Sequence, residues 1–351
     1  MSQQTYRVIQ WATGTVGTYA LRHFVENPTF GLAGVYVTNP EKAGKDAGDI
    51  AGIAPTGVIA SDDIDAVLAI EADCVHFSPL VQDVDLVCRL LRSGKNVVSP
   101  MGPYHRTEHF RPLWEPIEAA CRDGGTSFHG SGIHPGFAGD ILPLTLTRLM
   151  ERIDHIHVYE VVDHLANPSN YIAFMGFGRE CEDLLANPSR SGEAPAIFAQ
   201  SMAMVLESLG RSIDDLTARL EVAAATRDIP YPGGVVRQGT VAGQHYEWTA
   251  WSQGAPVMTF HCFWVMGDDV EPRWDCGPSG YRVRIEGNPP LEVTMGAPSA
   301  GPDKGKYAGL PWTAMAGVNA IPAVCDAEPG IVTHLDLGVF GPRGLFRPDQ
   351  S

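Results

Sequence analysis

The sequence predicts an α/β fold, with a doubly wound parallel sheet first and then an α+β domain whose open sheet is mainly antiparallel. Three observations carry this prediction. A glycine turn joins an apolar strand to an amphipathic helix near the start, strands and helices alternate to about residue 140, and strand-like segments dominate thereafter. Such alternation is typical of a parallel sheet with helices on both faces.

The first thirty residues give the strongest signal. They predict a strand over 6–11, a helix over 17–26 and a turn between them that contains Gly14 and Gly17. This arrangement aims backbone N–H groups and the positive end of a helix at a phosphate. Ala12 stands at the first position of the usual G-x-G-x-x-G pattern. We therefore predict a Rossmann-type dinucleotide site, whose pyrophosphate contacts are Thr13, Gly14, Thr15, Val16 and Gly17.

A second strand is predicted over 32–38, and its end lies where such folds contact the adenosine ribose. The hydroxyl of Thr38, the amide of Asn39 and the ammonium group of Lys42 suit a phosphate better than a carboxylate would. This favours NADP, with NAD as the alternative because Glu41 and other carboxylates lie close by. The competing interpretation is that the loop lysines are ordinary solvated charges.

The remaining elements of the first domain place its other loops. Strands are predicted over 73–77, 96–99 and 126–130, and helices over 61–69, 82–93 and 110–123. Ligands of such sheets bind at the carboxyl ends of the strands. The predicted cofactor contacts from these loops are Ser78, Pro79, Pro100, Met101 and His134.

After a helix predicted from Asp140 to Arg152, the predicted elements change from alternating strands and helices to mainly strands. Strands are then expected over 154–163, 217–226, 235–242, 245–252, 256–266, 280–286 and 291–296, with helices over 194–208 and 312–325. We predict a nucleotide domain over 1–140, a substrate and dimerisation domain over 141–310, and a C-terminal segment over 311–351 that packs back on the nucleotide domain. Asn319 of the last helix is a further candidate cofactor contact, although a structural role ahead of Pro322 fits equally well.

Composition excludes several classes of function. The 351 residues carry a net charge of −16, which argues against nucleic acid and anionic membranes as partners. No apolar stretch approaches the ~20 residues that cross a bilayer, and the N-terminus lacks the features of a signal peptide. Seven scattered cysteines without a C-x-x-C pair indicate buried thiols in a reducing cytoplasm. No metal site is indicated.

Five local patterns carry a family resemblance: Gln10-Trp-Ala-Thr-Gly-Thr-Val-Gly17, Lys42-Ala-Gly-Lys-Asp-Ala-Gly48, Gly132-Ile-His-Pro-Gly-Phe137, Met175-Gly-Phe-Gly178 and Val318-Asn-Ala-Ile-Pro322. Together they resemble the proteins with a dihydrodipicolinate-reductase-like N-terminal domain, a group that includes 2,4-diaminopentanoate dehydrogenase and the native amine dehydrogenases. The resemblance covers most of the chain. It implies a Rossmann domain, a substrate domain with an open sheet, NAD(P) as cofactor and a homodimer.

The chain departs from two reaction patterns of these relatives. Dihydrodipicolinate reductases carry a His-His pair and a lysine, whereas residues 160–169 hold the single His164 and no lysine. The amine dehydrogenases use a glutamate in the loop after the strand at 96–99. That residue would fall near Gly102 to Tyr104, where this chain has none, and Glu108 is the closest. Amine dehydrogenase activity in the strict sense is therefore in doubt, and interconversion of an alcohol and a ketone is favoured instead.

A dehydrogenase moves a proton as well as a hydride, so a titratable group is required near the nicotinamide. We predict His105 for this role, with Glu108 and Tyr104 as rivals. The structural alternatives are a surface histidine and a glutamate that stabilises the first turn of the following helix. For His134 the alternative is an N-terminal helix cap.

An aromatic and methionine cluster follows in the second domain, comprising Tyr171, Phe174, Met175 and Phe177. It fits the wall of an apolar ligand site, although a core at the domain interface is equally consistent. The sequence therefore predicts an NAD(P)H-dependent oxidoreductase for a small to medium, largely apolar carbonyl or imine, or the corresponding alcohol or amine. The alternative is a non-catalytic NADP-binding sensor protein, and the missing family residues keep that alternative open.

Overall fold

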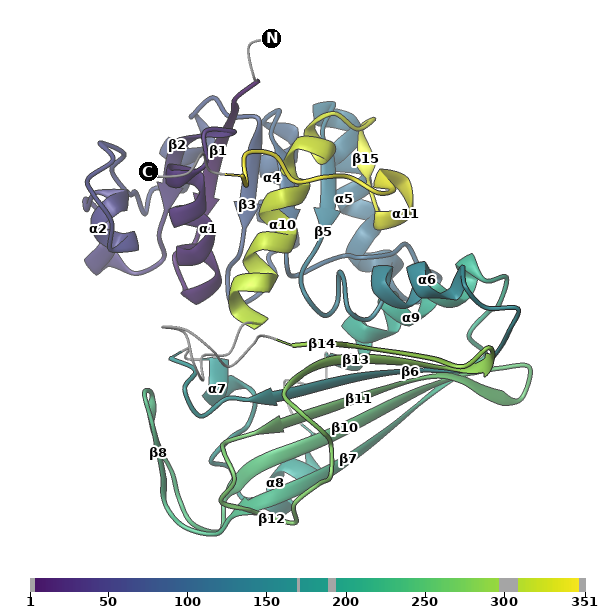
Figure 1. Ribbon diagram of the computed structural model, residues 1–351. Helices are drawn as coiled ribbons and strands as arrows, with labels where there is room; N and C mark the ends of the chain where they lie inside the picture. Colours follow the sequence, from purple (N-terminus) through teal and green to yellow (C-terminus); the bar gives the residue numbers. More distant parts are fainter. Residues whose placement is uncertain (1–3, 169–170, 189–193, 297–308, 347–351) are drawn as a thin grey trace. The chain divides into compact units, whose positions relative to one another are not determined.

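The computed structural model describes residues 4–168, 171–188, 194–296 and 309–346. The chain divides into two compact units (Figure 1). The first comprises Met1–Gly136 together with Leu310–Ser351, and the second comprises Phe137–Gly309. We call them the nucleotide unit and the sheet unit. The predicted boundaries were 140 and 310.

The nucleotide unit is built on a six-stranded sheet in the order β15-β5-β4-β3-β1-β2. All of its strand pairs are parallel. The strands are β1 (Tyr6–Trp11), β2 (Phe30–Tyr36), β3 (Cys74–Phe77), β4 (Asn96–Ser99), β5 (Ser127–Gly130) and β15 (Gly330–Ile331).

Helices cover both faces of this sheet. α1 (Thr15–Glu26) and α10 (Gly309–Cys325) pack on one face through a core that includes Phe24 and Val318. α4 (Val84–Arg92) and α5 (Arg111–Gly124) pack on the other face, as Figure 1 shows. The shorter helices are α2 (Ala47–Ala51), α3 (Ile64–Leu68) and α11 (His334–Leu337), with the 3-10 turns η1 (Pro40–Lys42) and η2 (Glu108–Phe110). Sheets covered on both faces are built from apolar strands, and every residue of β3 is buried.

The sheet unit is built on a seven-stranded sheet in the order β12-β7-β10-β11-β6-β13-β14. Of the described strand pairs in this second sheet, only that of β11 with β6 is parallel. The strands are β6 (Arg152–Asp163), β7 (Asp215–Ala225), β10 (Val241–Ser252), β11 (Ala255–Val265), β12 (Val270–Glu271), β13 (Gly280–Asn288) and β14 (Leu291–Met295); β8 (Ile229–Tyr231) and β9 (Gly234–Val236) form a separate hairpin. The helices are α6 (Ile141–Thr147), α7 (Tyr171–Phe174), α8 (Cys181–Ala186) and α9 (Ala194–Ser208).

The central strands of this sheet have two different faces because successive side chains alternate. One face, here called the core face, carries apolar side chains such as Val158, Trp248 and Phe260, and α9 packs on it through Phe198. The other, here called the histidine face, carries polar and aromatic side chains that are partly exposed. Its members include His155, His157, Tyr159, His245, Glu247, His261, Arg282 and Glu286.

The predicted fold class is confirmed, including the mainly antiparallel second sheet. Two sequence predictions differ in detail. The strands expected over 235–242 and 245–252 are a short β9 and one continuous β10, and the helix expected from Asp140 to Arg152 ends at Thr147. No helix of the described residues is long and apolar enough to cross a membrane.

Candidate active site

The turn between β1 and α1 has the shape of a phosphate-binding loop. A Cβ added at Gly17 would lie 2.1 Å from the Ala12 carbonyl oxygen, so only glycine lets the helix pack this closely on the turn. A Cβ at Gly14 would meet nothing within 4 Å. Gly14 is the N-cap of α1 and contributes no side-chain cap, so the first N–H groups of the helix can serve an anion.

Ala12 adopts a left-handed conformation, with φ of 69°. It stands where the usual pattern has its first glycine, and it keeps the glycine-like backbone at a cost of about 1–2 kcal/mol. The departure from the motif is therefore in the side chain and not in the shape of the turn. The turn fits a dinucleotide pyrophosphate.

A buried polar network supports the turn from below. Gln10 is fully buried, and its amide donates to the Ala12 carbonyl at 2.7 Å and to the Ser78 hydroxyl at 3.0 Å. His76 Nδ1 donates a hydrogen bond to the Gln10 carbonyl oxygen at 2.9 Å. Burial lowers the pKa of His76 to about 4, so this ring is neutral. Ser78, a predicted cofactor contact, thus lies directly beneath the glycine turn, with Pro79 next to it in sequence.

Lys42 reaches the same turn from the second strand's loop. Its ammonium group donates to the Thr13 carbonyl at 2.8 Å and to the Thr13 hydroxyl at 3.2 Å. Asn39 caps η1 by accepting from the Glu41 N–H at 3.0 Å, and both Thr38 and Asn39 are exposed. The structure therefore brings the predicted ribose-side residue Lys42 to the predicted pyrophosphate-side residue Thr13.

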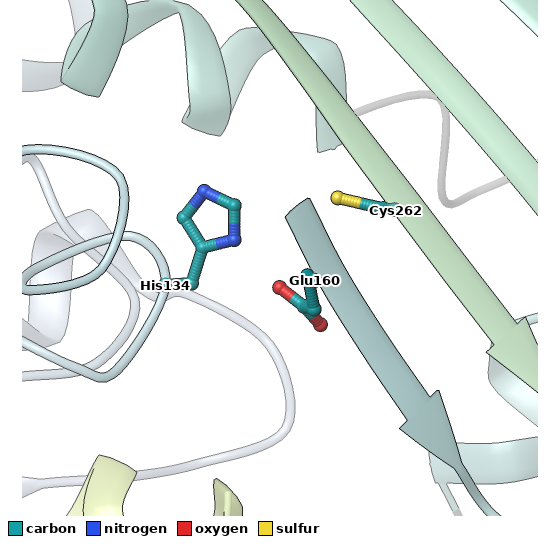
Figure 2. Close-up of side chains that lie close together, drawn as sticks. All are labelled: His134, Glu160 and Cys262. Carbon is teal, nitrogen blue, oxygen red and sulfur yellow. The ribbon is translucent and has the colours of Figure 1, made fainter. Parts of the chain in front are cut away.

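The loop after β5 holds His134 (Figure 2). His134 is half-buried. The loop is tight, because Gly136 has φ of 117° and a Cβ there would lie 2.2 Å from the Gly132 nitrogen. Asn319 is half-buried on α10, which packs on the sheet through its neighbour Val318.

The loop after β4 holds the three catalytic candidates, which differ in burial and in hydrogen-bond partners. The Tyr104 hydroxyl is buried and donates to the carbonyl of Pro100. Glu108 is paired with Arg111 at 2.6 Å, and its side chain is 79% exposed. His105 is half-buried on the same loop, and Met101 donates its N–H to Ser99. Hydrogen bonds from Arg111 hold the pKa of Glu108 below its usual value, which agrees with the structural alternative for this glutamate.

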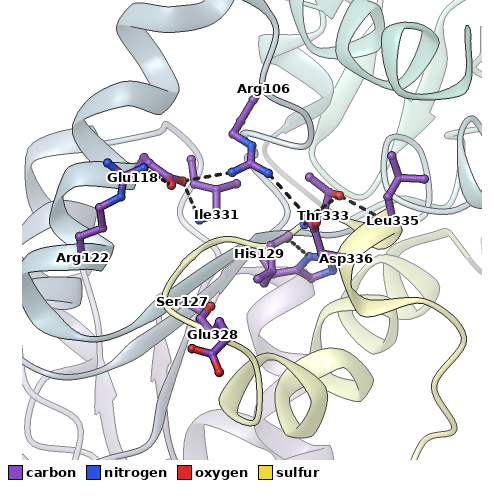
Figure 3. Close-up of polar contacts among 11 residues, drawn as sticks. Arg106, Glu118, Arg122, Ser127, His129, Glu328, Ile331, Thr333, Leu335 and Asp336 are labelled. Atoms are coloured by element: carbon purple, nitrogen blue, oxygen red, sulfur yellow. Dashed lines mark hydrogen bonds and ion pairs between the residues drawn. The ribbon is translucent and has the colours of Figure 1, made fainter. Parts of the chain in front are cut away.

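Arg106 anchors this loop to the C-terminal segment (Figure 3). Its guanidinium lies 3.6 Å from Glu118 on α5 and 3.9 Å from Asp336 on α11. Glu118 also accepts from the Ile331 N–H at 2.9 Å, and His129 Nδ1 donates to the Val332 carbonyl at 2.8 Å. The C-terminal strand and helix thus fix the loop that carries His105.

The predicted substrate residues fall into two groups. Tyr171 and Phe174 of α7 stack with their ring centroids 5.4 Å apart, and Tyr171 is 41% exposed. Met175 and Phe177 are buried in the hydrophobic core of the sheet unit. Only the first pair is open enough to contact a ligand directly.

Sequence reasoning missed Glu160, a carboxylate on the core face of the sheet (Figure 2). It is 7% exposed, and it lies on β6 between Val158 and Val162 of the same face. Its Oε1 accepts from Trp264 Nε1 at 2.9 Å, and its partner across the strand pair is Cys262 on β11. Burial and the neighbouring Glu160 carboxylate raise the pKa of the Cys262 thiol well above its usual value. An acidic residue at an alternating position of the predicted strand over 154–163 was the available signal.

A glycine turn on a parallel sheet, followed by a second domain with its own sheet, is the arrangement of a two-domain nucleotide-dependent dehydrogenase. The model of the 2,4-diaminopentanoate dehydrogenase C-terminal domain matches residues 137–346. The chain belongs to this family, as the sequence motifs implied.

Known proteins of the same family match over most of the chain. An amine dehydrogenase of Streptomyces virginiae is 31% identical over 98% of this chain and 99% of its own length. The 2,4-diaminopentanoate dehydrogenase of Acetoanaerobium sticklandii is 24% identical over 67% of this chain and 63% of its own. The structure of an amine dehydrogenase from Mycobacterium smegmatis superposes with a TM-score of 0.79 at 20% identity, covering 97% of each chain.

The protein is therefore an NAD(P)-dependent oxidoreductase of the dehydrogenase type. The prediction of an enzyme is confirmed, and the alternative of a non-catalytic sensor is not favoured.

Proposed function

We propose that the protein is an NADP-preferring dehydrogenase that interconverts a small to medium, apolar carbonyl compound and its amine, with Glu160 as the group that binds the amine. The observation that carries this proposal is the burial of Glu160 on the core face of the sheet, between Val158 and Val162. The names of the relatives, an amine dehydrogenase and a diaminopentanoate dehydrogenase, support amine chemistry.

The chemistry follows from the surroundings of Glu160. A largely buried carboxylate favours a positively charged ligand, because opposite charges attract more strongly where water is excluded. A protonated amine or iminium supplies that charge, whereas a neutral alcohol or ketone does not. Trp264 fixes the carboxylate by its hydrogen bond to Oε1. Glu160 would hold the substrate nitrogen and move its protons, and the nicotinamide supplies or accepts the hydride when it is bound.

Glu160 takes the place of the loop glutamate that the sequence lacks. His105 remains the sequence-based candidate for proton transfer, with Tyr104 and Glu108 as rivals. The bond from the Tyr104 hydroxyl to Pro100 and the pairing of Glu108 with Arg111 make both rivals less suited to proton transfer. We assign the stacked pair of Tyr171 and Phe174 to the apolar part of the substrate.

The decisive experiment compares Glu160→Gln with the wild-type protein in the amination of apolar ketones, using ammonium and NADPH. We expect kcat to fall by about 10²-fold or more, as is typical for loss of a general acid or base. Nucleotide affinity should stay unchanged, because Gly14 and Lys42 are untouched. Glu286→Gln is the matched control, since it is the same substitution on the histidine face of the same sheet.

Two outcomes would contradict the proposal. Retention of most of the wild-type rate in Glu160→Gln would remove the carboxylate from the reaction. Ketone reduction that proceeds equally well without ammonium would replace amine chemistry with alcohol chemistry.

NADP preference rests on Lys42 and on the exposed Thr38 and Asn39 beside it. Titration with NADPH and with NADH, followed by nicotinamide fluorescence, tests this preference. We expect Lys42→Ala to weaken NADPH binding about tenfold more than NADH binding, the effect of losing one charge-assisted bond to the extra phosphate. The exposed Lys45→Ala serves as the control, and tighter binding of NADH by the wild-type protein would overturn the preference.

We also propose a homodimer in the cytoplasm. The family resemblance supports the homodimer, and light scattering of the purified protein tests it. Seven cysteines without a disulfide support a reducing compartment.

A further inference from the structure

Three side chains with metal-binding atoms converge on the histidine face, away from the proposed amine site. His245 and Glu247 are two residues apart on β10 and therefore point to the same face. His261 lies directly opposite Glu247 on β11. The ligand atoms of the three residues all lie within 4.8 Å of one another.

The distances suit a small metal ion. Zn²⁺ binds nitrogen and oxygen at about 2.0–2.2 Å, so neighbouring ligand atoms of a tetrahedral site are about 3.3–3.5 Å apart. His261 Nδ1 lies 3.4 Å from Glu247 Oε2, which is one edge of such a site. The third ligand needs only a small side-chain adjustment to complete it.

The outer partners of the two histidines are also in place. Glu221 Oε2 lies 3.3 Å from His245 Nδ1, and Trp274 Nε1 donates to the same carboxylate at 3.0 Å. His157 Nδ1 lies 3.2 Å from His261 Nε2. Metal-binding histidines use one ring nitrogen for the metal and the other for such a partner. Each histidine here has that arrangement.

The remaining ring nitrogen of His245 is the strongest indication. His245 is 9% exposed, and its Nε2 atom is buried without a hydrogen-bond partner among the described residues. Two arginines of the same sheet already have partners: Arg219 is paired with Glu221 at 2.5 Å, and Arg282 lies over the ring of Tyr159.

We propose that His245, Glu247 and His261 form a binding site for a divalent transition metal of the zinc type, with water as the fourth ligand. The metal would join β10 and β11 at the centre of the sheet. Because the site lies on the face opposite to Glu160, it stabilises the sheet unit and takes no part in the proposed amine reaction. The sequence showed no metal motif, because the ligands come together only through the register of two strands.

Zinc binding by the chelator-treated full-length protein tests the site, measured by competition with a chromophoric chelator. We expect one zinc ion per chain, a higher melting temperature with zinc, and visible absorption bands of a four-coordinate ion with Co²⁺. His245→Gln and His261→Gln should each lower zinc affinity by at least about tenfold, and Glu221→Gln should lower it about 10–100-fold.

His155→Gln is the matched control, because His155 lies on the same face but bonds to Pro256 and Thr259 instead. Its zinc affinity should equal that of the wild-type protein. If a histidine variant fails to fold, Glu247→Gln provides the same test at a partly exposed position. Absence of zinc binding in the wild-type protein, or wild-type affinity in His245→Gln and Glu247→Gln, would overturn the proposal.

Discussion

The two sheets of this protein use their side chains in opposite ways. The parallel sheet is covered on both faces, so its strands are mainly apolar, and buried polar side chains such as Gln10 and His76 bond to one another within the core. The mixed sheet has one apolar face, while its histidine face is partly exposed. In the first sheet, therefore, chemistry is confined to the strand ends. In the second sheet, the side chains that can take part in chemistry lie on the faces, with Glu160 on the core face and the histidines on the histidine face.

The largest expected effect is the difference in stability between substitutions on the two faces of the mixed sheet. Trp248 is fully buried on the core face and stacks on Phe198, with ring centroids 4.7 Å apart. Trp251 lies on the same strand and donates to Thr217 at 3.1 Å on the other face. We expect Trp248→Ala to lower the free energy of unfolding by about 3–5 kcal/mol, and Trp251→Ala by about 1 kcal/mol. Denaturant unfolding measures both, and equal losses would show that the faces are equally buried.

A second test compares histidines of the two sheets by pH. Burial lowers the pKa of His129 to about 3, because both faces of the parallel sheet are covered. The unfolded chain takes up this proton below about pH 6.5, while the folded chain does not until about pH 3, so stability falls as the pH drops through this window. Between pH 8 and pH 5 the loss from His129 is about 2 kcal/mol.

His129→Gln should therefore flatten the pH dependence of the free energy of unfolding by about 2 kcal/mol between pH 8 and pH 5. His155→Gln is the comparison from the histidine face, where burial lowers the pKa of His155 by a smaller amount. Its profile should change less than that of His129→Gln. An unchanged slope in His129→Gln would mean that another group dominates acid unfolding.

The fold was predictable because both sheets follow strict local patterns. The strand over 6–11 was predicted at its observed bounds, and the alternation over 154–163 placed β6 within two residues. Short elements such as β15 and β8 span only two or three residues. They are too short to show a hydrophobic period, so only the folded chain reveals them.

The candidate site was predictable only where it depends on a local motif. The glycine turn and Lys42 are local, and the structure brings them together. Glu160 occupies a buried position of the alternating pattern, where Ile156, Val158 and Val162 are apolar, so the pattern alone predicts an apolar residue there. The three proposed metal ligands depend on how β10 pairs with β11. Register between strands is set by tertiary packing, and a single sequence does not display it.

The smallest effect concerns the one strained position of the nucleotide turn. Ala12 has φ of 69°, and glycine adopts this conformation without the steric cost of a Cβ. The side chain is 7% exposed and makes part of the apolar core, so its removal offsets some of the relief. Ala12→Gly should raise the free energy of unfolding by about 0.5–1 kcal/mol, and it should leave NADPH affinity unchanged because the shape of the turn is already that of glycine. Gly17→Ala provides the opposite control, since its Cβ would overlap the Ala12 carbonyl oxygen and should abolish nucleotide binding. A loss of stability in Ala12→Gly would mean that the packing of this methyl group outweighs the strain of its backbone, and the turn would then be stabilised by its core contacts.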